Sequence, residues 1–301
     1  MVNGLMRPRS FGTHDGSFHA DEITACALLV IFDKIDLDKI LRTRDIEELD
    51  KCEYVCDVGG VYDTKCKRFD HHQTEYKGGY SSAGMVLKYL KEQRVIEWRL
   101  YRYLNAFLVK GVDAIDTGRA TPQPGHSTFS SIIANFVPIH YDAEPQVLRD
   151  AFFQALDFCI GHIKRLIARF YYIQKYRSEV KSEMSKNAKV MFFDRPMPWL
   201  EVFFELGGHM HPAVFIIMPT GSQWKLRAIP PTYDKRMRVR VPLPKEWAGL
   251  IDEELKERSR IPGAVFCHKG RFISVWETKE DAIKACEYVL RGRKKGNGHS
   301  F

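Results

Sequence analysis

The spacing of apolar residues in the first 120 positions switches between the period of a strand and that of a helix. Short apolar runs predict strands that end near Thr13, at KILRT and at EYVCDV. Helical spacing begins near Asp21 in ITACALLVIF and returns in DIEEL, in SAGMVLKYLKEQ with Ser81 or Ser82 as its cap, and over residues 98–115. This alternation is typical of α/β proteins, so we expect a parallel sheet with helices on both faces.

A second region with a different pattern follows a long helical stretch at residues 144–186. From Val190 onward, VMFF, EVFFEL, AVFIIM, WKLRAI, RVRVPL and AVFCH are predicted strands, and KEDAIKACEYVLRG is a predicted closing helix. We therefore expect an N-terminal parallel-sheet domain over residues 1–140, a helical connector over 141–187 and a smaller C-terminal α+β domain over 188–301.

The positive charge of the chain is concentrated in this second region. The formal net charge is +8. Residues 186–301 contain 21 Lys and Arg against 13 Asp and Glu, whereas residues 1–185 contain 25 of each class. Such an excess indicates a polyanionic partner, although a solvated basic surface would explain the charge equally well.

Other features of the sequence bear on the compartment. No run of about 18 uncharged apolar residues occurs, so we expect no membrane span. The seven cysteines are scattered without paired CxxC spacing, which argues against a disulfide framework and fits a reducing cytosol. The basic N-terminus lacks the apolar run of a secretory signal, while a short transit peptide stays open. We predict a cytoplasmic protein.

Carboxylate and imidazole side chains gather at four places in the N-terminal region. Three of these places follow predicted strands, and ligands in open α/β sheets gather at the carboxyl ends of strands. The clusters are His14, Asp15, His19, Asp21 and Glu22 in THDGSFHADE, Asp57 in CDVGG, Asp70, His71 and His72 in RFDHHQ, and Asp113 and Asp116 in VDAIDTG.

Each cluster taken alone has a structural explanation. Asp21 and Glu22 would favour a helix N-terminus without any metal, Asp57 could serve a turn, and the carboxylates of VDAIDTG could be solvated. The joint occurrence favours metal. Imidazole and carboxylate without thiolate suit Mn²⁺, Mg²⁺, Fe²⁺ or Co²⁺, and the number of ligands suits two ions, which in such sites clamp the oxygens of a phosphoryl transfer. We assign the bridging position to Asp57, which has no alternative nearby.

The string FDHHQ, with a lone strand-end aspartate and a His/Asp motif before it, resembles the DHH phosphoesterase superfamily. More closely, GTHDGSFHADE, RTRD, CDVGG, RFDHHQ, SSAG, VDAIDTG, VPLPKEW and IPGAVFCHKGRFIS, in this order, resemble the MYG1 family (UPF0160) from about Gly12 to Val289. The resemblance implies two domains, a catalytic N-terminal α/β domain, Mn²⁺ or Mg²⁺, hydrolysis of phosphodiester or phosphoanhydride bonds, and 3′–5′ exonuclease activity on RNA.

The resemblance also implies a role for each residue of the site. One metal would be held by His14, His19 and Asp57, and the second by Asp21, Asp57, His71 and Asp116.

His72 would contact the scissile phosphate, and Asp70 would orient the neighbouring imidazole. Two departures matter for these roles. His19 stands where many members of the superfamily have an aspartate, so the metal preference is open. Asp113 competes with Asp116, and we prefer Asp116 because Thr117 follows it, as in the Asp-Thr pattern of the superfamily.

Basic residues of the C-terminal region are expected to bind substrate. KRMRVR would place Arg238 and Arg240 on one face of a strand, where they suit backbone phosphates, although a solvated edge strand is equally consistent. In FCHKGRFIS, a hairpin turn explains the position of three polar residues, and phosphate binding explains their type: His268, Lys269 and Arg271.

The sequence thus predicts a two-metal phosphodiesterase, specifically a 3′–5′ exonuclease acting on RNA or other single-stranded nucleic acid. Two divalent ions are expected, with Mn²⁺ first and Mg²⁺ or Co²⁺ as alternatives. Hydrolysis of a small phosphate compound, such as a dinucleotide or pyrophosphate, is the alternative reaction. A non-catalytic nucleic-acid-binding protein is less consistent with an intact ligand set. A homodimer stays open.

Overall fold

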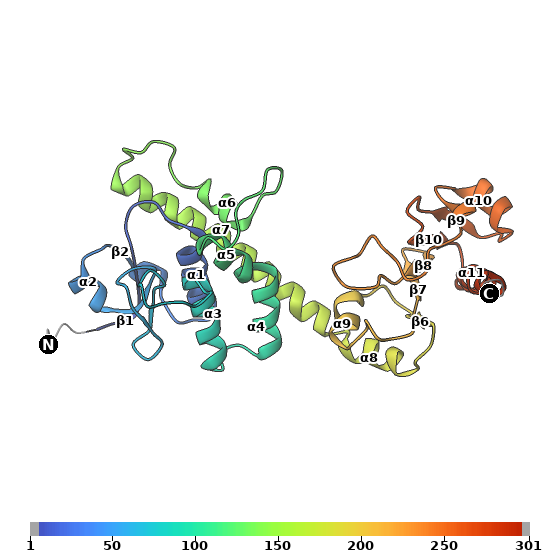
Figure 1. Ribbon diagram of the computed structural model, residues 1–301, viewed down its shortest axis with the longest axis horizontal. Coiled ribbons are helices and arrows are strands. Elements are labelled where there is room, and N and C mark those ends of the chain that lie inside the picture. The colour runs from blue at the N-terminus through green and yellow to red at the C-terminus, as the bar shows by residue number, and fades with distance from the viewer. Residues whose placement is uncertain (1–5, 297–301) are drawn as a thin grey trace. The chain divides into compact units, whose positions relative to one another are not determined.

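The protein consists of two compact units. A computed structural model describes residues 6–296, with side chains described up to residue 292 (Figure 1). The boundary between the units lies between Phe170 and Tyr171. It falls inside the predicted helical connector, while the three-part division into residues 1–140, 141–187 and 188–301 stays a prediction.

Unit 1 is built around a five-stranded sheet with the strand order β2-β1-β3-β5-β4. The first three neighbouring pairs are parallel, and only β4 runs antiparallel to its partner. The helices and strands are β1 (Arg7–Thr13), α1 (Ala20–Ile31), η1 (Leu37–Lys39), β2 (Ile40–Arg42), α2 (Ile46–Asp50), β3 (Cys52–Cys56), β4 (Tyr62–Asp63), β5 (Arg68–Phe69), α3 (Ser82–Glu92), α4 (Trp98–Leu104), the π-helical segment η2 (Asn105–Val109), α5 (Lys110–Asp116), α6 (Phe129–Ala134) and α7 (Pro145–Gln174), which continues into unit 2.

Alternation along β3 distributes its side chains to two cores. Tyr54 and Cys56 join the main core, which contains the buried faces of α1, α3 and α7. Val55 points the other way and packs against Leu49 of α2 in a smaller cluster. Helices therefore lie on both faces of a mostly parallel sheet, and the predicted α/β class is confirmed.

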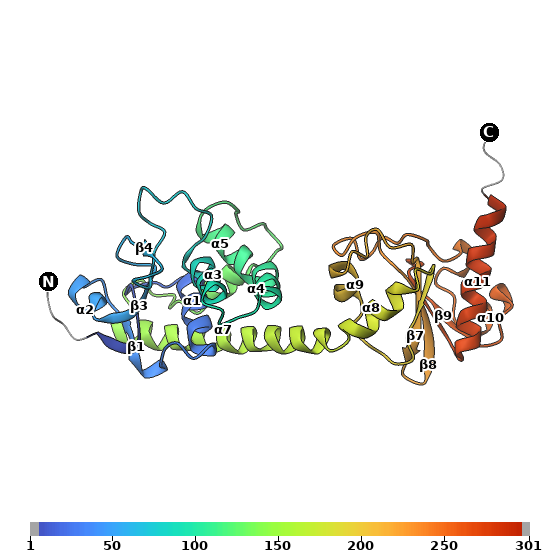
Figure 2. The same cartoon turned by 90° about the horizontal axis from the view of Figure 1, so that it is seen from below.

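Unit 2 contains a second five-stranded sheet with the order β6-β7-β8-β10-β9, in which only β6 and β7 are parallel. One core lies between this sheet and α11, and another contains residues of α8 and α9 on the opposite side (Figure 2). The elements are α8 (Arg177–Ser185), β6 (Val190–Phe192), α9 (Leu200–Glu205), β7 (Phe215–Thr220), β8 (Gln223–Ala228), η3 (Lys245–Trp247), α10 (Asp252–Ser259), β9 (Ala264–Cys267), β10 (Ile273–Trp276) and α11 (Lys279–Gly296).

Two predicted strands of this unit are wrong. EVFFEL forms helix α9, whose buried residues Leu200, Val202 and Phe203 lie on one side at helical spacing. RVRVPL contains no strand. Its backbone is partly extended, with Leu243 N–H bonded to Arg271 O, but the prolines at positions 242 and 244 have no N–H to donate to a ladder. The alternation of Arg238 and Arg240 on a strand face is therefore absent. Within residues 6–296, no helix is both long and apolar enough to cross a membrane.

Candidate metal centre

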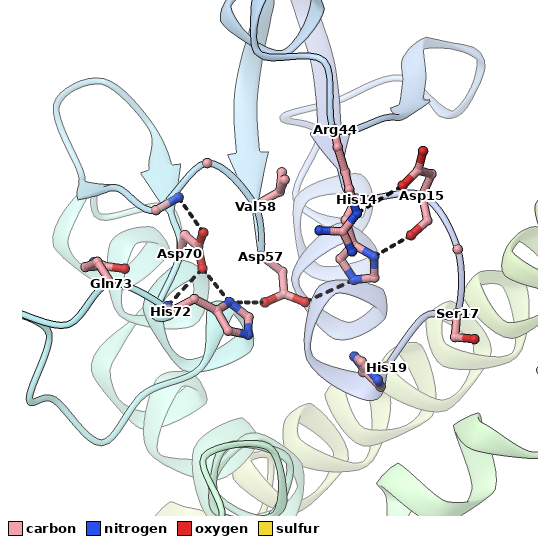
Figure 3. Close-up of a pocket in the computed structure, with 13 residues that line it drawn as sticks. His14, Asp15, Ser17, His19, Arg44, Asp57, Val58, Asp70, His72 and Gln73 are labelled. Atoms are coloured by element: carbon pink, nitrogen blue, oxygen red, sulfur yellow. Dashed lines mark hydrogen bonds and ion pairs between the residues drawn. The ribbon is translucent and has the colours of Figure 1, made fainter.

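The carboxyl ends of three parallel strands bring the predicted ligands together in unit 1. His14 follows β1, Asp57 follows β3, and the segment Asp70–His72 follows β5. These strands are neighbours in the order β1-β3-β5, so their ends meet at one edge of the sheet. Figure 3 shows the side chains facing a shared cleft of about 610 Å³.

Asp57 lies at the centre of this cleft and contacts imidazoles on both sides. Its Oδ2 is 3.3 Å from His14 Nε2. Its Oδ1 is 3.4 Å from His72 Nδ1 and 3.7 Å from His71 Nδ1. The backbone of Asp57 has a φ of 58°, an uncommon conformation outside glycine that ends β3 abruptly. The two glycines that follow, at positions 59 and 60, also have positive φ and continue the turn.

His14 lies between two buried carboxylates. Its Nε2 is 3.3 Å from Glu22 Oε1 as well as from Asp57, and its Nδ1 is 2.8 Å from the carbonyl oxygen of Asp15. Burial acts to lower the pKa of His14, but the two carboxylates raise it to about 10. Burial also raises the pKa of Asp57, against the opposing effect of His14. The negative charge around His14 therefore favours the protonated imidazole. A metal cation would fit in the place of that proton.

His71 and Asp116 form the opposite side of the cluster. His71 Nε2 is 3.0 Å from Asp116 Oδ2, and this carboxylate outweighs burial and raises the pKa of His71. Asp116 also groups with His19 and Asp21, since one ligand atom of each lies within 4.8 Å of the others. Burial, followed by the charge of Asp57, raises the pKa of Asp21 well above its usual value.

Asp113 belongs to none of these ligand groups and instead forms structural hydrogen bonds. Its Oδ1 accepts hydrogen bonds from Ser81 N at 3.0 Å, from Ser81 Oγ at 2.8 Å and from Gly84 N at 3.0 Å. Asp113 therefore caps the N-terminus of α3 from a distant part of the chain, and the side chain of Ser81 makes no cap bond of its own. A Cβ on Gly84 would lie 2.3 Å from Asp113 Oδ2, which explains the glycine of SSAG.

Asp70 orients His72. Its Oδ1 lies 2.8 Å from His72 Nδ1 and accepts from His72 N at 3.1 Å, while its Oδ2 accepts from Gly60 N at 2.6 Å. Burial acts to raise the pKa of Asp70, but the hydrogen bonds from Gly60 and His72 lower it. His72 is otherwise exposed, with 62% of its side-chain surface accessible, and it lines the cleft.

Glu22 of the first cluster and Arg44 received no role in the predicted site. Glu22 is fully buried, accepts from His19 N at 2.8 and 2.9 Å, and groups with His14, His19 and Asp57 as a fourth possible ligand. Its sequence signal was the spacing of a capping box, in which a glutamate bonds the backbone three residues before it. Arg44, from RTRD, lines the cleft and pairs with Asp15 at 3.1 Å.

Apart from His72, the predicted substrate-binding residues lie in unit 2. Arg240 donates to four backbone carbonyl groups, those of Gly208, His211, Ala213 and Pro230, at 2.6–3.1 Å. These bonds occupy its guanidinium group and give it a structural role.

Arg238 is not part of a regular element. His268, Lys269 and Arg271 lie in the connection between the antiparallel strands β9 and β10, as the hairpin explanation requires. His268 Nδ1 accepts from Gly270 N at 2.9 Å. Phosphate binding by these residues stays a prediction.

Lys225 and Arg227 of β8 were not among the predicted residues. Both are about half-buried, and burial followed by a neighbouring positive charge lowers the pKa of each. Arg227 lies 5.7 Å from the ring centre of Phe272. Among the described side chains, no carboxylate lies within ion-pair distance of either. Alternation within WKLRAI was their only signal.

The cleft of unit 1 fits divalent metal ions. Three of the buried side-chain atoms that lack a hydrogen-bond partner among the described residues belong to predicted ligands, namely Asp21 Oδ1, Asp57 Oδ1 and His71 Nδ1. Burying such atoms without a partner is costly, so a ligand that they can coordinate would stabilise them. The donors are carboxylate oxygens and imidazole nitrogens without thiolate, a set that suits hard and borderline divalent cations.

The chain is similar to proteins of one family along nearly its whole length. The model of the MYG1 exonuclease family, described as an uncharacterised protein family (UPF0160), matches residues 10–290. The MYG1 protein of Chlamydia pneumoniae is 52% identical over 287 residues, which cover 95% of this chain and 98% of that protein. The MYG1 exonuclease of Homo sapiens is 30% identical over 336 aligned positions, covering 96% and 88%.

Among solved structures, the chain is similar to RecJ from Thermus thermophilus in complex with Mn²⁺. The identity is 14%, the alignment covers 94% of this chain and 52% of that chain, and the TM-score is 0.28. Exonuclease RecJ bound to manganese gives a TM-score of 0.27 at 12% identity, covering 95% and 92%. TM-scores of this size carry no argument. The family match spans residues 10–290, so the chain belongs to the MYG1 family (UPF0160).

Proposed function

We propose that this protein is a metal-dependent phosphodiesterase, specifically a 3′–5′ exonuclease that acts on RNA or other single-stranded nucleic acid. One observation carries the proposal. Asp57 Oδ2 faces His14 at 3.3 Å, and Asp57 Oδ1 faces His72 at 3.4 Å and His71 at 3.7 Å. A single buried carboxylate with donors on both sides is suited to bridge two ions, the arrangement of two-metal phosphoryl transfer.

The contacts between the predicted ligands support part of the division of labour that the family resemblance implied. His14, His19 and Asp57 would hold one ion, with Glu22 close enough to contribute.

The second ion would be held by Asp21, Asp57, His71 and Asp116. His71 links this set, since it lies 3.7 Å from Asp57 and 3.0 Å from Asp116. Asp116 in turn groups with Asp21, although His19 belongs to the same group. When bound, two Mn²⁺ ions supply Lewis acidity at the phosphoryl group.

His72 would donate a hydrogen bond from Nε2 to a phosphate oxygen. Asp70 fixes the ring for that contact through Nδ1.

Three observations support a nucleic-acid substrate. The human relative is named an exonuclease. The excess of positive charge lies in residues 186–301. Lys225 and Arg227 are half-buried without an acidic partner among the described side chains, and a phosphate group would compensate them. RNA as the substrate and the 3′–5′ direction rest on the family resemblance. A cytosolic location is proposed from the seven free thiols.

The proposal is tested with purified protein, Mn²⁺ and three substrates: a 5′-labelled single-stranded RNA, a dinucleotide and pyrophosphate. A ladder of products shortened from the 3′ end is expected from the RNA, and Asp57→Asn should abolish it. Turnover of the small compounds alone would favour a small-phosphate hydrolase. RNA binding without turnover of any substrate would favour a non-catalytic protein. Metal analysis after gel filtration should give two ions per chain, and sedimentation would show whether a homodimer forms.

A further inference from the structure

A basic and aromatic surface lies in unit 1 outside the cleft, at the end of α3 and along α4. Residues 88–110 contain six Lys and Arg against two Glu, although residues 1–185 as a whole are neutral. The helices α4, η2 and α5 run without interruption from Trp98 to Asp116, so one end of this helical run belongs to the surface and the other to the metal centre (Figure 1).

Trp98 is the central feature of this surface. It is 58% exposed, whereas three of the other four tryptophans are at least 96% buried and Trp224 is partly buried. Its ring stacks on Tyr101, with 5.4 Å between centroids and 21° between planes. Lys91 Nζ lies 5.9 Å from the Trp98 ring centre and 5.3 Å from that of Tyr101. The indole is thus held in one orientation while more than half of it faces solvent.

Four of the six cations in residues 88–110 are exposed and have no ion-pair partner among the described side chains. Glu92 is 3.9 Å from both Lys88 and Lys91, so one of the two acidic groups of the segment is already shared. Among the described side chains, no carboxylate lies within ion-pair distance of the remaining four cations, which are Arg94, Arg99, Arg102 and Lys110. Arg102 lies one turn after Trp98, on the same helix face. Guanidinium groups beside an open indole match a phosphate backbone with unstacked bases.

We propose that α4 is a second contact site for the single-stranded nucleic-acid substrate, outside the metal cleft. A base stacks on Trp98, and Arg99 and Arg102 contact the adjoining phosphates. The proposal rests on the proposed function, since it concerns the strand whose end is cleaved at Asp57. An anionic membrane would use the same cations. The exposed residues next to Trp98 are Glu97, Arg99 and Arg102, however, and these charged side chains are not suited to insert into lipid.

The helix length gives the scale of a strand that reaches both sites. From residue 98 to residue 116 the helical rise is about 27 Å, at about 1.5 Å per residue. At about 3.4 Å per stacked nucleotide, this corresponds to roughly eight nucleotides. The α4 site therefore affects long substrates and has no effect on a dinucleotide.

The test measures binding in EDTA, where hydrolysis cannot contribute. Single-stranded RNAs of 4 and 20 nucleotides are titrated into the protein and followed by fluorescence anisotropy and tryptophan quenching. Trp98→Ala should weaken binding of the longer RNA roughly tenfold and remove most of the quenching. Arg99→Gln combined with Arg102→Gln should reduce the slope of log K against log salt by about 1.4. Glu97→Gln should strengthen binding.

A matched control removes two exposed positive charges elsewhere, with Lys164→Gln and Arg165→Gln on α7. This control should bind the longer RNA like the wild type. Equal losses in the control and in the α4 variants, or unchanged binding in all of them, would overturn the proposal. Stronger binding to phosphatidylserine vesicles than to RNA would do the same. If the protein cleaves no substrate but the α4 variants still lose RNA binding, the α4 proposal stands and the exonuclease proposal is rejected. If cleavage is normal and the α4 variants bind RNA like the wild type, only the exonuclease proposal stands.

Discussion

The two aspartates of VDAIDTG should differ in what their replacement by alanine changes: folding stability for Asp113, and metal binding for Asp116. Asp113 is buried and accepts three hydrogen bonds, at 2.8–3.0 Å, from Ser81 and Gly84. Asp113→Ala leaves these three donors at the start of α3 without an acceptor. At about 1 kcal/mol each, the lower end for a buried unsatisfied donor, the cost is about 3 kcal/mol. For a domain of this size, that corresponds to a fall in Tm of about 6–12 °C.

Asp116 is expected to contribute to metal binding and little to folding. Its one short contact is to His71 Nε2 at 3.0 Å, and its charge opposes that of the buried Asp21. Asp116→Ala should therefore change the metal-free stability by no more than about 0.5 kcal/mol. The same variant should lose one ion and most of the cleavage activity.

The assay is urea unfolding of both alanine variants, in EDTA and with excess Mn²⁺, followed by circular dichroism. Asp113→Asn is the matched control, because its amide oxygen can replace Oδ1 as the acceptor at α3. It should recover most of the stability that Asp113→Ala loses. The assignment of the two aspartates is refuted if Asp116→Ala unfolds about 3 kcal/mol more easily in EDTA while Asp113→Ala unfolds like the wild type.

The remaining predictions concern metal, pH and packing. Removing metal with EDTA should lower the Tm in a scanning calorimeter, and free Mn²⁺ at a thousand times its Kd should restore about 4 kcal/mol. Burial raises the pKa of Asp113 to about 6 from 3.8, so the stability contributed by its protonated form is present below pH 3.8 and lost as the pH rises through 6. Urea unfolding across that range should show the wild type losing stability relative to Asp113→Asn. Gly84→Ala should lower the Tm despite the higher helix propensity of alanine, because its Cβ would lie 2.3 Å from Asp113 Oδ2. Arg240→Gln should destabilise unit 2 in urea, since Arg240 donates to four carbonyls, whereas Arg238→Gln should unfold like the wild type.

The regular part of the fold could be predicted because local periodicity determined it. The strand ending at Thr13, the helix after His19 and the strand before Asp57 all appear at the predicted places. The error at EVFFEL has a physical cause, since a six-residue segment with four apolar or aromatic residues is compatible with either a strand or a helix. There, tertiary packing of Leu200 and Phe203 determines the outcome.

Long-range partners could not be predicted in the same way. Ser81 or Ser82 was expected to cap α3, and Ser81 is the N-cap residue. Its side chain makes no cap bond, however, and the acceptor is Asp113, 32 positions later in the chain. The carboxylates of VDAIDTG were therefore assigned different roles only by analogy with a family motif. Lys225 and Arg227 escaped notice for a related reason, because the absence of an acidic neighbour is a property of the folded unit.

The helix dipole stabilises some of the carboxylates proposed as ligands and disfavours another. This difference explains why Asp116 should be dispensable for folding. Asp21 and Glu22 lie in the first turn of α1, where the positive end of the helix dipole favours a negative charge. Asp116 is the last residue of α5, where the dipole disfavours a carboxylate by about 0.3–1 kcal/mol. A charge placed against the dipole and beside buried Asp21 gains little from the fold itself. Its compensation must come from His71 or from a bound cation, so the stability of this corner should follow the metal concentration.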